Sequence, residues 1–245
     1  MPTNETEILS SQTRADSPAG TSGHTRLRMS SSSTLLLLSI SFSLIFLLTG
    51  PMPDTGPLFK VASILLLALL GFRVSALLGM ALLLGALGDL LLGVTHLGPL
   101  NSEQLFLFGL VSFLVGHLVY IVMFRREPRA KLTFPRALGI LAVVIALSSM
   151  LSLLYKSLGP LLIPVVVYAL VLATMAISAR LAELGNPLAA SGALFFVASD
   201  AMLAIAKFRS PFFASAALIW ITYYLAQLLI YLGVARHNSQ TRLQP

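Results

Sequence analysis

The chain has 245 residues, of which 57% are hydrophobic and only 10% charged, and its formal net charge is +7. A soluble protein of this length needs far more polar surface, so the composition predicts an integral membrane protein. The sequence contains no cysteine, which excludes disulfides, cysteine-ligated zinc, iron–sulfur clusters and a thiol nucleophile.

The chain opens on a polar segment. Residues 1–33 are rich in Ser and Thr and have no periodic apolar face, so we expect a disordered tail. This tail is too long and too polar for the leading part of a cleaved signal peptide. The first apolar run after it is therefore interpreted as a retained helix.

Eight apolar segments follow, each close to the roughly 20 residues that an α-helix needs to cross a bilayer. Prolines fall at or near most of the proposed ends, and Pro164 falls within the first turns of the sixth segment, where proline is tolerated. The pattern predicts an all-α, polytopic bundle with a transmembrane domain over 34–235 and a short basic tail over 236–245. The proposed spans are 34–50, 57–73, 74–94, 103–124, 136–155, 160–180, 187–206 and 211–233.

The basic residues are distributed unevenly along these segments. An even number of helices places both termini on one side of the membrane. If that side is the cytoplasm, twelve Lys and Arg residues lie inside, five of them between residues 125 and 136. Only four lie outside: Lys60, Lys156, Lys207 and Arg209. Because cytoplasmic loops are enriched in basic residues, we predict that both termini are cytoplasmic, and we interpret the positive charge as a topology signal rather than a nucleic-acid site. In a bacterial host the location would be the inner membrane.

Two aspartates, Asp89 and Asp200, lie inside apolar segments, the third and the seventh. A charge near the middle of a bilayer costs roughly 2.5–3.5 kcal/mol even on lenient insertion scales. Structural contacts between helices are usually met by Ser, Thr or Asn at lower cost. The two residues therefore indicate a functional carboxylate pair, one protonated and one ionised. The structural alternative is two separate helix–helix hydrogen bonds or an ion pair with Lys60.

Other polar side chains recur within the spans. At about 1.5 Å of rise per helical residue, both aspartates fall in the outer half of their helices, while His117 and Gln227 fall roughly 10 Å nearer the cytoplasm. This predicts an elongated pocket rather than one tight cluster. His117 is compatible with a proton relay, a head-group contact, a metal ligand or a packing role. His24, His96 and His237 lie in tails or loops, which disfavours a membrane zinc hydrolase.

Several short motifs occur in a definite order. They are Lys60 at the start of the second segment, Gly85–Leu92 (GALGDLLL), Phe113–Tyr120 (FLVGHLVY), Tyr168 with Met175, Gly192–Asp200 (GALFFVASD) and Tyr223–Ile230 (YYLAQLLI). In this order and helix placement the chain resembles the YhhN-like family of eight-helix membrane proteins, which includes the lysoplasmalogenases. The resemblance covers about residues 34–235.

The resemblance implies hydrolysis of the vinyl-ether bond of a lysoplasmalogen, a lysophospholipid drawn from the bilayer, with Asp89 and Asp200 as the catalytic pair. Such cleavage needs a proton on the β-carbon and water on the α-carbon, which two carboxyl groups can supply without a metal or cofactor. A proton-coupled transporter and a lipid-binding protein that uses the same carboxylates are the alternatives. The expected substrate-binding residues are Lys60, His117, Tyr120, Tyr168, Ser199, Tyr223 and Gln227.

Overall fold

The computed structural model describes residues 30–49, 56–94 and 99–242. Within them lie eight helices long and apolar enough to cross a membrane, so the predicted all-α, multi-pass membrane fold is confirmed. Arg129 and Ala182 form an isolated β-bridge, and the described ranges contain no β-strand. The helices are α1 (Ser31–Thr49), α2 (Gly56–Val74), α3 (Ala76–Gly93), α4 (Ser102–Arg125), α5 (Phe134–Leu154), α6 (Leu162–Leu181), α7 (Leu188–Phe208) and α8 (Ser215–Thr241), with a 3₁₀ turn, η1 (Gly159–Leu161), before α6.

Local sequence accounts for some of the helix boundaries. The Asn101 side chain accepts from the backbone N–H of Gln104, whose own side chain accepts from the N–H of Asn101, a capping box that starts α4. Pro164 is the third residue of α6, where no helical hydrogen bond is lost. Only Ser75, in an extended conformation, separates α2 from α3. The directly adjoining predicted spans 57–73 and 74–94 indicate the same absence of a loop.

The largest difference in boundaries is at the end of α8. The helix runs to Thr241, whereas the hydropathy pattern predicts an end near residue 233. Hydropathy falls at Arg236, but helical hydrogen bonds do not require apolar side chains. Two contacts hold the polar extension: Asn238 donates to the carbonyl of Val74, and His237 pairs with Glu127 at 3.1 Å. Of the predicted tail over 1–33, residues 1–29 lie outside the described ranges.

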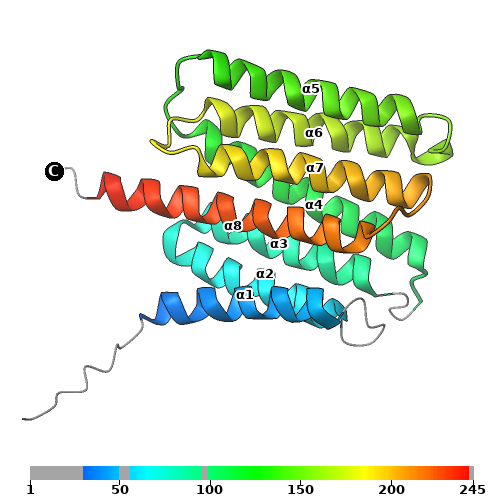
Figure 1. Ribbon diagram of the computed structural model, residues 1–245, viewed down its shortest axis with the longest axis horizontal. Coiled ribbons are helices and arrows are strands. Elements are labelled where there is room, and N and C mark those ends of the chain that lie inside the picture. The colour runs from blue at the N-terminus through cyan, green and yellow to red at the C-terminus, as the bar shows by residue number, and fades with distance from the viewer. Residues whose placement is uncertain (1–29, 50–55, 95–98, 243–245) are drawn as a thin grey trace, which may run out of the picture. The chain divides into compact units, whose positions relative to one another are not determined.

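The helices lie side by side (Figure 1). Helix α8 packs against α7 on one side and α2 on the other, α3 packs between α2 and α4, and α5 and α6 pack against α7. Large apolar side chains remain exposed on the outer helix faces, among them Leu69, Leu141 and Leu170. Such a surface is suited to lipid rather than water.

Charged residues mark the two ends of the bundle. At one end, Arg136 pairs with Glu183, and Ala130 N donates to the carbonyl of Leu181. We call this the arginine end; it carries Arg73, Arg125, Arg126, Arg129, Arg136, Arg180 and Arg236. We call the other the lysine end; it carries Lys60, Lys156 and Lys207. Which end faces the cytoplasm stays a prediction.

Candidate functional site

A cavity of about 760 Å³ contains both aspartates. Its wall runs from the lysine end, at Pro57 and Val94, to Phe113 in the middle of α4. Five of the predicted site residues line it together with one further cation: Lys60, Asp89, Ser199, Asp200, Tyr223 and Lys207. Helices far apart in the sequence thus bring the two carboxyl groups to one space.

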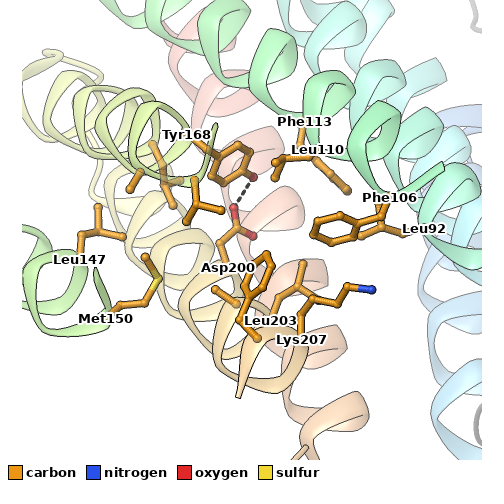
Figure 2. Close-up of a pocket in the computed structure, with 15 residues that line it drawn as sticks. Leu92, Phe106, Leu110, Phe113, Leu147, Met150, Tyr168, Asp200, Leu203 and Lys207 are labelled. Carbon is orange, nitrogen blue, oxygen red and sulfur yellow. Dashed lines mark hydrogen bonds between the residues drawn. The ribbon is translucent and has the colours of Figure 1, made fainter. Parts of the chain in front are cut away.

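Asp200 is held by two side chains from other helices. The Tyr168 hydroxyl donates to Asp200 Oδ2 at 2.5 Å, and Figure 2 shows this contact. His117 Nε2 lies 3.1 Å from the same hydroxyl and 3.5 Å from Oδ2. Because Tyr168 uses its proton on Asp200, its oxygen is left to accept, so Nε2 is the protonated nitrogen of His117. Asp200 Oδ2 thus faces two donors.

This contact corrects the predicted depth of His117. The sequence places His117 about a third of a helix away from Asp200, yet the two side chains meet and His117 is buried. Counting residues from a helix end ignores tilt and the reach of side chains. Phe196, one turn before Asp200, fixes the imidazole with an edge-on contact at 4.6 Å between ring centroids.

Asp89 has a different environment. Its Oδ2 is buried and has no hydrogen-bond partner among the described residues. The Tyr223 side chain lies close to the Asp89 carboxyl and lines the same cavity. Behind it, Gln227 Nε2 donates to Tyr223 at 3.2 Å, and Tyr120 donates to Gln227 Oε1 at 2.6 Å. Because the Tyr223 oxygen accepts from Gln227, its own proton remains available for donation into the cavity.

A glycine makes room for this chain. A Cβ at Gly85 would lie 2.7 Å from Gln227 Nε2 and 3.0 Å from the Tyr223 hydroxyl, closer than normal contacts. Gly85 therefore admits polar side chains of α8 to the neighbourhood of Asp89, one turn further along α3. Its role goes beyond the plain helix packing that small residues usually serve.

Lys60 contacts aromatic rings rather than a carboxylate. Its ammonium lies 4.6 Å from the Phe46 ring centroid and 5.2 Å from that of Trp220. Lys60 and Asp89 line the same cavity, but within the described ranges no carboxylate oxygen lies within 4.0 Å of the Lys60 ammonium. The ion pair considered from the sequence is not formed.

The remaining predicted residues differ in their access to the cavity. Ser199 lines the wall, but its hydroxyl donates to the carbonyl of Ile219 at 3.1 Å and ties α7 to α8. Tyr120, Gln227 and His117 are buried behind the lining side chains. These three contact Asp200, Gln227, Tyr120 or Tyr223 rather than the cavity, while Tyr168 lines a second pocket.

That second pocket is a narrow apolar slot of about 40 Å³ beside Asp200. It is lined by residues of α3, α4, α5, α6 and α7, and six residues line both it and the large cavity: Leu92, Phe106, Phe113, Asp200, Leu203 and Lys207. In Figure 2, Leu147 and Met150 lie on one side of Asp200, and Phe106 and Lys207 on the other. Asp200 thus lies where the cavity that contains the charged side chains meets an apolar slot.

Sequence reasoning missed four residues of the site: Phe46, Phe106, Lys207 and Trp220. Two carried a signal. Trp220 is the single tryptophan of the chain. Lys207 follows Asp200 by seven residues, which puts Lys207 and Asp200 on the same face of one helix. Among the described residues, no three His, Asp or Glu side chains are grouped so that they could hold a metal ion.

Comparisons with known proteins match the helical part of the chain. The model of the YhhN family matches residues 55–234. Curated relatives include a lysoplasmalogenase of Mycobacterium tuberculosis (strain CDC 1551 / Oshkosh), 37% identical over 158 residues, which are 62% of this chain and 58% of that protein. The human lysoplasmalogenase TMEM86B is 36% identical over 132 residues, 54% of each chain. The human lysoplasmalogenase TMEM86A is 35% identical over 152 residues, 57% of this chain and 59% of that protein.

These matches cover less than two thirds of each relative's length. No solved structure matches the chain.

Proposed function

Given that the chain belongs to the YhhN family, we propose that it is a membrane hydrolase that cleaves the vinyl-ether bond of lysoplasmalogens, releasing a fatty aldehyde and glycerophosphocholine or glycerophosphoethanolamine. The observation that carries this proposal is the single cavity that holds both Asp89 and Asp200. The names of the relatives support the same reaction, although each match covers only part of the relative.

The two carboxyl groups have unequal surroundings, which assigns their roles. Asp200 faces the donors of Tyr168 and His117, which stabilise a carboxylate. Asp89 buries an oxygen with no partner in the described part of the chain, and burying such an atom is less costly in a neutral carboxyl group than in an ionised one. We therefore assign Asp89 as the acid and Asp200 as the base.

The reaction follows from this assignment. Asp89 gives its proton to the β-carbon of the vinyl ether, leaving an oxocarbenium-like ion at the α-carbon. The Asp200 carboxylate stabilises this cation and takes a proton from the water that adds to the α-carbon. The resulting hemiacetal breaks its bond to the glycerol oxygen, which receives the hemiacetal proton as the aldehyde forms. Return of a proton from Asp200 to Asp89 restores the pair.

The supporting residues act through these two groups. His117 and Tyr168 orient Asp200, and Tyr120 and Gln227 orient Tyr223 beside Asp89. No step needs a further nucleophile, because the attacking group is water. The two aspartates and these supporting residues come from five helices, α3, α4, α6, α7 and α8.

The test is aldehyde release by the purified protein in detergent, supplied with a lysoplasmalogen. Asp89→Asn and Asp200→Asn should each lower the turnover rate by at least about a hundredfold, the range of general acid–base catalysis. Glu183→Gln makes the same chemical change at a half-exposed carboxylate on the arginine end, and it should retain activity.

Full activity in either aspartate variant would remove that residue from the mechanism. A well-folded wild type that releases no aldehyde would overturn the hydrolase proposal. Movement of intact solute across proteoliposomes would then identify a transporter, and lipid binding without a product would identify a lipid-binding protein.

A further inference from the structure

We infer that Lys207, together with Lys60, binds the phosphate of a lysophospholipid at the lysine end of the cavity, and that Lys207 sets the distance from this phosphate to Asp200. The inference rests on the proposed function, since it deepens the recognition of the same substrate. Lys207 belongs to neither the catalytic pair nor the side chains that orient it.

The first observation is that both lysines of the cavity contact aromatic rings. The Lys207 ammonium lies 4.6 Å from the Phe106 ring centroid, and Lys60 lies over Phe46 and Trp220. In the described ranges neither ammonium has a carboxylate oxygen within 4.0 Å. A ring face attracts a cation but accepts no strong hydrogen bond, so the N–H donors stay free for an anionic ligand.

The second observation is the spacing along α7. Lys207 follows Asp200 by seven residues, about two helical turns, so both side chains leave the same face roughly 10 Å apart. In a lysoplasmalogen, six covalent bonds separate the phosphorus from the α-carbon of the vinyl ether. An extended chain of six bonds spans about 7 Å. The length of the lysine side chain covers the remaining distance, so a phosphate bound at Lys207 places the α-carbon of the vinyl ether beside Asp200.

The third observation is the change in polarity across Asp200. Figure 2 shows the slot, in which Lys207 lies on one side of Asp200 and Leu147 and Met150 lie on the other. The large cavity, which also carries Lys60, shares Asp200 and Lys207 with the slot. A ligand bound across Asp200 therefore needs an anionic end and an apolar end. This pattern fits a lysophospholipid and disfavours a small water-soluble phosphate ester.

Binding can be measured without hydrolysis. Trp220 is the single tryptophan of the chain and lines the cavity, so its fluorescence reports on occupancy. The probe is a 1-O-alkyl glycerophosphocholine, whose saturated ether has no vinyl group to protonate. The comparison ligands are the 1-O-alkylglycerol with the same chain, which lacks the phosphate, and glycerophosphocholine, which lacks the chain.

Lys207→Gln should weaken binding of the phosphate-bearing lipid about tenfold, as expected for loss of a charged hydrogen bond. Binding of the alkylglycerol should stay within about twofold, and Lys207→Arg should restore most of the affinity for the phosphate-bearing lipid. Lys156→Gln is the matched control, because Lys156 is an exposed lysine of the same end that also lies over a ring, at Tyr155, but lines neither pocket.

An equal loss of affinity for both lipids would show that Lys207 only packs the wall, and no loss for either would likewise overturn the inference. Glycerophosphocholine binding as tightly as the lysolipid would replace the lipid by a soluble phosphate ester. The two proposals fail separately. Phosphate-dependent binding without aldehyde release would contradict the hydrolase proposal alone. Aldehyde release with KM and kcat unaffected by Lys207→Gln would contradict the lysine site alone.

Discussion

The Tyr168 hydroxyl lies between His117 and Asp200, where it accepts from one and donates to the other. Tyr168→Phe keeps the ring and removes this link. We expect kcat to fall about tenfold, the effect of one lost hydrogen bond to a charged group, with KM and protein yield near wild type. Tyr155→Phe, at an exposed tyrosine at the end of α5, is the control for aldehyde-release assays. An unchanged kcat in Tyr168→Phe would contradict the role of Asp200 as an oriented carboxylate.

A substitution at Gly85 tests the role of Gln227 and Tyr223, the side chains next to Asp89. A methyl group there would meet Gln227 Nε2 at 2.7 Å, so Gly85→Ala should displace Gln227 and Tyr223 from Asp89. We expect at least about a tenfold loss of turnover, because a misplacement of about 1 Å near reacting groups is costly. Gly116→Ala adds the same methyl group where the nearest atom is 3.4 Å away, and it should be tolerated. Equal activities in the two variants would rule out the steric role of Gly85.

Among the elements, α1 is notable because it lies outside residues 55–234, which match the YhhN family. Its Phe46 nevertheless lines the cavity beneath the Lys60 ammonium. Two buried serines anchor it: Ser39 bonds the carbonyl of Ser63 and the Tyr224 hydroxyl, and Ser43 accepts from Trp220 Nε1 at 3.0 Å. Polar anchors of this kind suit helix pairs in lipid, where apolar surface alone gives no preference for a partner.

Replacing both serines by alanine should loosen α1. The Trp220 N–H would lose its partner in a buried position, and an unsatisfied group of this kind costs about 1–3 kcal/mol. We expect a lower melting temperature in detergent and a weaker contact between Lys60 and its two rings, seen as a shift in Trp220 fluorescence. Ser148→Ala, at an exposed serine that bonds only its own helix, should change neither value. Wild-type stability in the double variant would show that α1 is held by packing alone.

Hydropathy was enough to predict each of the eight helices, because only an apolar run of about 20 residues crosses a bilayer. It missed the polar end of α8, since Asn238 and His237 are fixed by contacts with distant helices. The free-energy cost of a charge in the bilayer identified the two aspartates from the sequence, but it did not identify the side chains that contact them. His117 follows Asp89 in the sequence and yet serves Asp200, while Tyr223 follows Asp200 and lies beside Asp89. Which aspartate each of these side chains contacts depends on how the helices pack, and the spacing of residues in the sequence does not determine this packing.

For the whole molecule, the two charged ends predict an orientation in the membrane. The arginine end carries the basic residues between 125 and 136, and the cavity reaches the lysine end at Pro57 and Val94. By the positive-inside rule, we predict that the arginine end faces the cytoplasm. The cavity would then open toward the opposite side, so substrate would enter from the outer leaflet or its equivalent.

The absence of cysteine makes this orientation directly testable, because a single introduced thiol is labelled without background. Lys131 and Lys156 are both exposed and lie at the two ends of α5, so Lys131→Cys and Lys156→Cys differ only in the side of the membrane they report. In intact cells a membrane-impermeant maleimide should label Lys156→Cys at once and Lys131→Cys only after the membrane is opened. The reverse pattern would place the cavity mouth in the cytoplasm. Labelling of both thiols in intact cells would contradict the crossing of the membrane by α5 itself.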